Sequence, residues 1–466
     1  SVLCGRTIAR FASRWSSAGS LMTYTSVSLG SGWGLFSGIT YTMAMSLLTV
    51  GGVAFLAQFA EAFFQSFHVL SGMILACCIS LVIGVVCYLG VQVSMRVQLF
   101  VTLVSAFLVL LLGVDIIIVR LAADAVGNLA PRGNTSVHLT KSMAMNATTF
   151  PGVFARIFEA LSPSTAPSFT GFCKATLSAL LIFAGYESAA AFAEETKEAS
   201  RTVPKAIVFT VLICGIFYWW ASMTLALGYD SGQEWASDSS TLVSLATRYA
   251  GRFAGSILFI AVLFDGWAGS LACVNLVSRL YFALSRQGFL PQSFGRVGTY
   301  GTPHVAIAAI TCATVAVCVA TVSMGGSLST IFGFAVDGGS VLIQVSYFLV
   351  MVGGFVQFKS LEAALAAIVP IGAVLGALLG AHLSPGYTFA LCFLIVLGAS
   401  IVCVAQCSPR ALAHVAEIAH ASSTGNLLAI NDDGFNPPSR FHGLHLQDGN
   451  DVEEIEPLLG PIQETF

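Results

Sequence analysis

Long apolar runs, separated by short polar stretches, recur along nearly the whole chain. A helix of about 20 apolar residues is long enough to cross the hydrocarbon core of a bilayer. The pattern therefore predicts ten membrane spans. They cover residues 33–58, 69–90, 97–119, 169–193, 203–227, 253–277, 304–323, 328–355, 361–382 and 387–407.

The backbone limits what such spans can be. Amide and carbonyl groups find no water inside lipid, so a crossing segment must be a helix or part of a closed barrel. Barrel strands alternate apolar and polar residues over about ten positions, whereas these runs are longer and evenly apolar. The composition agrees, because 56% of the 466 residues are hydrophobic and only 9% are charged. The predicted fold class is all-α, a polytopic membrane helical bundle.

The charge pattern divides the chain into two parts. Basic residues gather in alternate loops, as at Lys197, Arg201 and Arg279, and the positive-inside rule assigns those loops to the cytoplasm. From Ser408 onward the chain holds nine of the 23 acidic residues but two of the 20 basic ones. We therefore expect a transmembrane domain over 1–408 and an acidic, mostly disordered cytoplasmic tail over 409–466. The protein is expected in the plasma membrane or an endomembrane compartment.

Two kinds of short motif bear on orientation and sorting. A long polar loop is expected over 121–168, opposite the basic loops, and it contains N-x-[ST] sequons at Asn134 and Asn146. The tail contains EIEPLL, residues 454–459, which resembles an acidic dileucine sorting signal. Motifs this short also occur by chance, so the orientation depends mainly on the charge pattern.

The stretch FAGYESAAAFAEETKEASRTVPKAI, residues 183–207, places Gly185 and Glu187 inside a predicted span. A buried carboxylate is costly in lipid, so it normally faces protein or water and marks a pathway. A glycine in a helix interior costs about 1 kcal/mol relative to alanine, so this is also the easiest place to unwind. We therefore predict a discontinuous helix whose free carbonyls and helix-end dipoles face a solute. The alternative is that Glu187 pairs with a neighbouring helix for packing specificity alone.

The connector after this span and three other residues are further candidates. Thr202 is expected to cap the next helix and Pro204 to occupy its first turn, where no amide hydrogen is needed. Asp265 and Asp337 each adjoin glycine within a span and are candidate pathway residues, although a helix-end or packing role is equally open. Tyr41 is a candidate gate residue, although an aromatic side chain on a helix face usually serves packing.

The sequence contains none of the constellations that a membrane enzyme would need. We find no H-E-x-x-H, no G-x-S-x-G, no glycine-rich phosphate loop and no clustered metal ligands. The 12 cysteines lie almost entirely in apolar runs without a C-x-x-C pair, and we expect small buried hydrophobes. No enzyme activity, metal, cofactor or nucleic-acid partner is predicted.

Three stretches together resemble one family, the amino acid, polyamine and organocation (APC) permeases. Residues 183–207 resemble the family's sixth span and the loop after it. Residues 278–307, SRLYFALSRQGFLPQSFGRVGTYGTPHVAI, are similar to the loop after the eighth span, and residues 11–39, FASRWSSAGSLMTYTSVSLGSGWGLFSGI, resemble the segment joining spans two and three. Their order and spacing agree with the family over nearly everything before the tail.

The resemblance implies a LeuT-like inverted five-plus-five repeat in which spans one and six are broken and hold the substrate between them. In the family, carbonyls around the sixth-span break hold the substrate amine. That role carries over to four residues here, with Glu187 beside them: Phe183, Ala184, Gly185 and Tyr186. The implied partners are an amino acid or a related amine and the lipid bilayer, with either protons or an exchanged solute as the coupling partner.

The same match places the start of the chain within span two, so the ten predicted spans correspond to spans three to twelve. The chain is thus expected to be N-terminally truncated and to lack the family's glycine motif of span one. We expect secondary active transport of amino acids by alternating access, coupled to protons or to an exchanged solute. An amine or polyamine permease, a nutrient sensor and an inactive transporter-like fragment stay open as alternatives.

Overall fold

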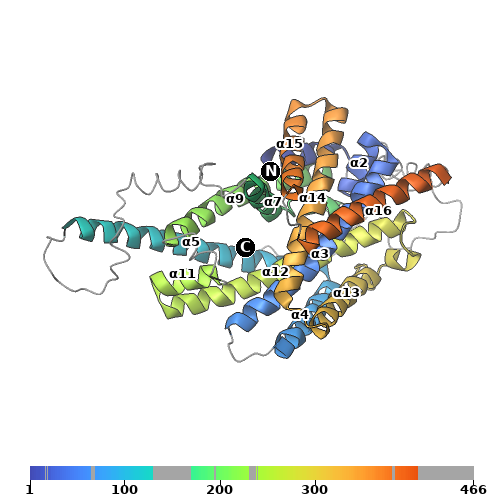
Figure 1. Ribbon diagram of the computed structural model, residues 1–466. Coiled ribbons are helices and arrows are strands. Elements are labelled where there is room, and N and C mark those ends of the chain that lie inside the picture. Colours follow the sequence, from blue (N-terminus) through green and yellow to red (C-terminus); the bar gives the residue numbers. More distant parts are fainter. Residues whose placement is uncertain are drawn as a thin grey trace, which may run out of the picture. The chain divides into compact units, whose positions relative to one another are not determined.

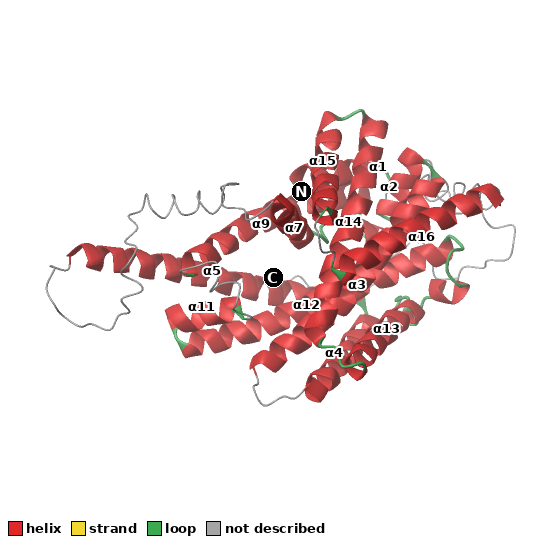
Figure 2. Cartoon of the chain, viewed as in Figure 1, coloured by secondary structure: helices red, strands yellow, loops and turns green. Residues whose placement is uncertain are grey.

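The structure of the chain is a computed structural model. It describes residues 1–63 apart from 16 and 18, 69–129, 169–229 apart from 194 and 195, 238, 240–379 and 384–407. The tail, both sequons and the dileucine-like motif lie outside the described residues. Within the described part, every regular element is a helix (Figure 2), as the apolar runs predict.

Figure 1 shows the described helices in their order along the chain. They are α1 (Val2–Arg14), α2 (Leu21–Leu29), α3 (Ser31–Phe63), α4 (Val69–Leu89), α5 (Val91–Leu129), α7 (Phe169–Ile182), α8 (Ser188–Ala191), α9 (Ala199–Gly228), α11 (Thr241–Ala250), α12 (Arg252–Arg286), the 3₁₀ helix η3 (Gln292–Gly295), α13 (His304–Ser323), α14 (Leu328–Phe358), α15 (Leu361–Leu378) and α16 (Pro385–Cys407).

Nine of the described helices are long and apolar enough to cross a membrane. The tenth predicted span, residues 169–193, is divided into α7 and α8. Large apolar side chains on the outside of the bundle are exposed, including Phe253 at 80% and Ile216 at 70%. Soluble monomers rarely expose so many large apolar side chains. This exterior is typical of an integral multi-pass membrane protein.

The centre of the bundle is the contact between α3 and α14, which lie side by side. Small residues let the two helices approach closely. A Cβ on Gly51 of α3 would lie 2.6 Å from the Ala335 Cβ, and one on Gly339 of α14 would lie 3.0 Å from a Leu48 methyl carbon. Close packing of this kind replaces the hydrophobic driving force that helices lack in lipid.

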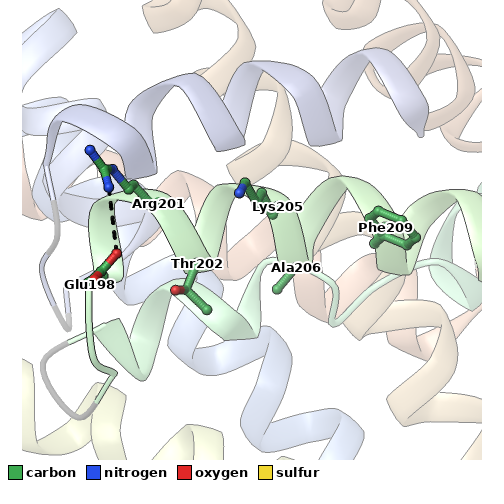
Figure 3. A pocket seen from close by; sticks show the side chains of 6 residues that line it. All are labelled: Glu198, Arg201, Thr202, Lys205, Ala206 and Phe209. Carbon is green, nitrogen blue, oxygen red and sulfur yellow. Dashed lines mark ion pairs between the residues drawn. The ribbon is translucent and has the colours of Figure 1, made fainter.

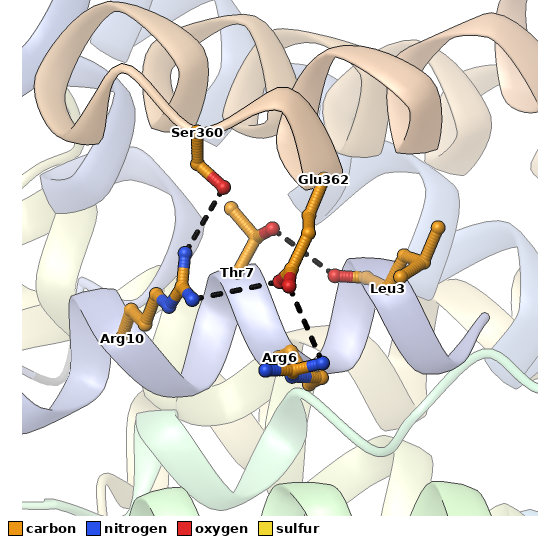
Figure 4. A network of polar contacts seen from close by, with 6 residues as sticks. All are labelled: Leu3, Arg6, Thr7, Arg10, Ser360 and Glu362. Carbon is orange, nitrogen blue, oxygen red and sulfur yellow. Dashed lines mark hydrogen bonds and ion pairs between the residues drawn. The ribbon is translucent and has the colours of Figure 1, made fainter.

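Helix α1 packs against α9, α14 and α15. Arg6 and Arg10 pair with Glu362 of α15 at 3.4 and 3.5 Å, and Arg10 Nη1 donates to Ser360 Oγ at 3.0 Å (Figure 4). All three charged side chains are more than a third exposed. Exposed pairs of this kind contribute at most about 1 kcal/mol each, so apolar packing holds α1 in place.

Several element boundaries differ from the prediction. The region 121–168 was expected to be a loop, but α5 continues through its first nine residues to Leu129. The predicted start of α9 was also wrong: it begins at Ala199, its Thr202 hydroxyl donates to the Lys197 carbonyl, and Pro204 lies inside the helix. The N-cap Glu198 has a left-handed backbone, φ 49°, so the chain turns into the helix earlier than the side-chain pattern suggests.

The cysteines also differ in part from the prediction. Cys4, Cys87 and Cys173 are buried as expected, but Cys78 and Cys312 are exposed on the outside of the bundle. On an apolar exterior, a small hydrophobic thiol is as compatible with lipid as with the protein interior.

One connection outside the spans is polar and well bonded. Asp238 accepts hydrogen bonds from the Tyr229 hydroxyl at 2.6 Å and from the Ser240 amide at 2.8 Å. Partial burial acts to raise the pKa of Asp238, but these bonds and those from the Ser240 and Ser244 side chains together hold it below its ordinary value. The carboxylate thereby fixes the turn that leads into α11, a short amphipathic helix that the search for span-length runs did not predict.

Candidate functional site

The site begins where α7 stops. Five residues, 183–187, form turns instead of helix before α8 resumes at Ser188. Gly185 has φ +113°, a backbone conformation that a residue with a Cβ rarely adopts. The predicted discontinuity is therefore present, and the glycine is the residue that permits it.

The interruption leaves backbone acceptors without partners. The Gly185 carbonyl accepts from the Ser188 amide at 3.0 Å. Within the described part of the chain, the carbonyls of Phe183, Ala184 and Tyr186 accept no hydrogen bond. Tyr186 is buried and Phe183 and Ala184 are half-buried, and an acceptor left unpaired away from water costs about 1–3 kcal/mol. These carbonyls are therefore ready to accept hydrogen bonds from an ammonium group.

Glu187 is fully buried and its carboxyl group is held by three donors. The Tyr41 hydroxyl of α3 donates to Oε1 at 2.7 Å, the Tyr347 hydroxyl of α14 donates to Oε2 at 2.5 Å, and the Gly185 amide donates to Oε2 at 3.0 Å. We call this set the Glu187 clamp. The clamp ties the interruption to the two central helices, α3 and α14. Glu187 therefore makes contacts between helices, as the alternative of a packing role predicts, and it also braces the break.

Tyr347 was not predicted from the sequence, but α14 contains a signal that could have found it. Asp337, Ser340, Gln344 and Tyr347 are spaced by three, four and three residues, which places them on one face of a helix. Polar residues on one face of a membrane helix indicate contact with protein or solute. Gln344 is 1% exposed, and neither its amide nitrogen nor its amide oxygen has a partner in the described part of the chain.

The structure brings Tyr41 and Glu187 together, but it gives the two aspartates other contacts. Asp265 of α12 is half-buried and accepts from Thr102 Oγ1 of α5 at 3.0 Å. Asp337 lies where α16 packs on α14, so that a Cβ on Gly386 would be 2.7 Å from the Asp337 Cβ. The pathway role of both aspartates stays a prediction.

The short helix α8 is positioned by α12. The Arg279 guanidinium lies 4.1 Å from the centre of the Phe192 ring, directly after α8, and its Nη1 donates to the Asn275 carbonyl at 2.9 Å. Arg279 was assigned to a loop from the charge pattern, but α12 continues to Arg286 and the side chain is 5% exposed. A buried guanidinium on an aromatic face is a desolvated cation–π contact, and it fixes the far side of the break.

Within the described part of the chain, two hollows lie along α9, and one of them adjoins the break. A cavity of about 130 Å³ is lined by residues 182–186 together with Thr210, Val211, Cys214 and Tyr218. The other, about 460 Å³, lies at the start of α9 among Glu198, Arg201, Thr202, Lys205, Ala206 and Phe209 (Figure 3). Its Arg201–Glu198 pair is 3.8 Å long and largely exposed. The smaller cavity is therefore the candidate solute site, because the unpaired carbonyls belong to residues that line it.

Comparison with known proteins adds to this geometry. Residues 1–417 match the sequence model of a family described as "Amino acid permease". The chain is 26% identical over 306 residues to the branched-chain amino acid permease BcaP of Bacillus subtilis, covering 64% of this chain and 60% of that protein. It is 30% identical over 116 residues to the low-affinity putrescine importer PlaP of Escherichia coli, covering 24% of this chain and 25% of that protein. The chain thus spans less than two thirds of these relatives.

Proposed function

The chain belongs to the amino acid permease family of the APC superfamily, and from this membership we propose that it moves amino acids across a membrane by alternating access. The family and the relatives are transporters and not enzymes. Coupling to protons or to an exchanged solute, and a cytoplasmic position for the tail, are parts of the same proposal. The solute is a small molecule that carries an amine.

One observation supports the proposal above the others: the interrupted helix with three unpaired carbonyls beside a cavity. The carbonyls of Phe183, Ala184 and Tyr186 offer hydrogen-bond acceptors in a region that lipid would otherwise leave without polar groups. Broken helices of secondary transporters use such groups to hold polar solutes near the bilayer midplane. We therefore assign the solute amine to this stretch, with Glu187 bracing it.

A second candidate follows from the relative whose name states putrescine import. A diamine has the same ammonium group but a second cation in place of the carboxylate. A nutrient sensor would bind an amino acid without moving it, and an inactive fragment would do neither. Binding and flux therefore have to be measured separately.

The test uses the purified full chain and a glycine pair. Gly185→Ala places a Cβ on a residue with φ +113°, whereas Gly333→Ala places one in open space on α14. Strained backbone of this kind costs about 1–3 kcal/mol. We expect radiolabelled amino acid to bind and to enter proteoliposomes with the wild type and Gly333→Ala, and both activities to fall at least about fivefold with Gly185→Ala. Binding without uptake would identify a sensor, and neither binding nor uptake by the wild type would overturn the proposal.

A further inference from the structure

The hollow at the start of α9 takes no part in the proposed function. It is about 460 Å³ and is lined by Glu198, Arg201, Thr202, Lys205, Ala206 and Phe209 (Figure 3). We call it the basic hollow, because two of these side chains are cations and one is a carboxylate. A ligand would bind there whether or not the chain transports a solute.

Helix α9 has one face on the protein and one face outside it. The first face packs on α1 and carries three buried residues four positions apart: Val203, Ile207 and Val211. A shift of two positions turns a helix by about 200°. Arg201, Lys205 and Phe209 therefore project from the opposite face, and all three are exposed.

The exposed face of α9 continues as an apolar stripe beyond the basic hollow. Phe209 is followed by Leu212, Ile216 and Trp219 at intervals of three, four and three residues, which keeps all four side chains on one side of the helix. All four are exposed. Large apolar side chains on the outside of a membrane protein face the acyl chains of lipids, so this face of α9 changes from cationic to apolar at Phe209.

The length of α9 places the two cations at the depth of the lipid headgroups. A helix rises about 1.5 Å per residue, so the part from Phe209 to Gly228, where α9 ends, covers about 29 Å. The hydrocarbon core of a bilayer is about 30 Å thick. Lys205 and Arg201 then lie about 6 and 12 Å beyond the core along the helix, and their long side chains reach the headgroups.

The charge of the basic hollow is positive. Arg201 Nη1 lies 3.8 Å from Glu198 Oε2, but both side chains are largely exposed, and such pairs contribute little. Lys205 is exposed and forms no ion pair or hydrogen bond with the described residues. Arginine binds a phosphate through two N–H groups, and lysine acts as a point charge beside it. The two side chains therefore match a phosphodiester anion.

We propose that the basic hollow binds the phosphodiester of an anionic phospholipid, with Arg201 and Lys205 at the phosphate. One acyl chain then lies along Phe209, Leu212 and Ile216. A soluble phosphate would use the cations alone and leave the apolar stripe uncovered, and a zwitterionic lipid would bring its own cation to a hollow that is already positive. The positive-inside rule assigns this end of α9 to the cytoplasmic leaflet, whose anionic lipids attract such cations.

The test removes both cations and compares the effect with the loss of two other cations. Arg201→Gln with Lys205→Gln neutralises the cations of the basic hollow, whereas Arg96→Gln with Arg296→Gln removes the same charge from two other exposed positions. Native mass spectrometry of the purified full chain, titrated with dioleoyl phosphatidylglycerol or dioleoyl phosphatidylcholine, measures binding of each lipid.

We expect the wild type and the Arg96/Arg296 variant to prefer phosphatidylglycerol over phosphatidylcholine by at least about tenfold. The Arg201/Lys205 variant should bind phosphatidylglycerol at least about tenfold more weakly, because each cation near an anionic lipid contributes about fivefold. Its binding of phosphatidylcholine should stay within about twofold of the wild type. Equal losses in the two double variants, or a wild type without the preference, would overturn the proposal.

Two further measurements separate the lipid from other anions and guard against a variant that does not fold. Glu198→Gln removes the carboxylate of the basic hollow and should strengthen phosphatidylglycerol binding at least about twofold, whereas unchanged or weaker binding would contradict the proposal. Inorganic phosphate should displace the lipid no better than sodium chloride at the same ionic strength. Stronger displacement by phosphate would identify a site for soluble anions and overturn the lipid assignment, while the transport proposal would stand.

Discussion

The Glu187 clamp makes a quantitative prediction about tyrosine hydroxyl groups. Tyr41→Phe and Tyr347→Phe each keep a buried ring and remove one of the three donors to the Glu187 carboxyl group. A buried acceptor that loses a hydrogen-bond donor costs about 1–3 kcal/mol. We expect each variant to lose about 2 kcal/mol of stability, which corresponds to a roughly 25-fold larger population in which the break is released.

Tyr24→Phe is the matched control. Tyr24 is also fully buried, but its hydroxyl has no partner within the described residues, so its removal should be neutral or slightly stabilising. Thermal unfolding in detergent, followed by fluorescence-detected size exclusion, compares the three variants. The double variant should lose less than the sum of the single losses, because both hydroxyls share one carboxyl group. If Tyr41→Phe and Tyr347→Phe unfold at the same temperature as Tyr24→Phe and the wild type, the Glu187 carboxyl group does not hold the break.

Three further predictions concern the contact of α3 with α14, the attachment of α8 and the turn before α11. Gly339→Leu should lower the stability of the fold by about 1–3 kcal/mol, because it overpacks the contact of α3 with α14. Gly333→Leu has open space around its Cβ and should unfold at the wild-type temperature. Equal unfolding temperatures for the two variants would refute the close contact. Phe192→Leu should cost about 1–2 kcal/mol by removing the cation–π contact with the buried guanidinium, while Phe209→Leu, 66% exposed, should cost under about 0.5 kcal/mol. Because the pKa of Asp238 is lowered in the folded protein, its contribution to stability is present above the unfolded pKa of about 3.9 and is lost as pH falls through the folded value. The melting difference between wild type and Asp238→Asn should therefore be constant from about pH 8 to pH 5 and shrink below about pH 4, and a constant difference down to pH 2 would contradict this.

The apolar runs predicted the spans because, inside lipid, a helix is the simplest structure in which the backbone amides and carbonyls form hydrogen bonds with one another. The break at Gly185 was predictable for a related reason, since glycine and a carboxylate are both unfavourable in a continuous membrane helix. The partners of Glu187 were harder to predict. Tyr347 lies 160 residues further along the chain, so only the packing of α3 and α14 against the break brings its hydroxyl within reach.

Local sequence signals misplaced the start of α9 and missed α11. Thr202 before an apolar run resembles an N-cap, but the left-handed backbone at Glu198 starts α9 four residues earlier. Helix α11 has neither the length nor the hydropathy of a span, and a turn fixed by Asp238 precedes it. The lining of the cavity by α9 depends on how two spans pack, which no single stretch of sequence encodes.

The two halves of the interrupted helix are attached to different neighbours. Helix α7 packs on α15, and α8 is fixed to α12 through Phe192 and Arg279. Four residues cannot persist as an isolated helix, so α8 depends on its contacts with α12 and α9 and on the Glu187 clamp directly before it. A change in the separation of α12 from α15 would therefore act on residues 183–187, which join α7 to α8. The residues to which we assign the solute amine thus link these two attachments, so in the proposed alternating-access cycle the solute would lie at that link.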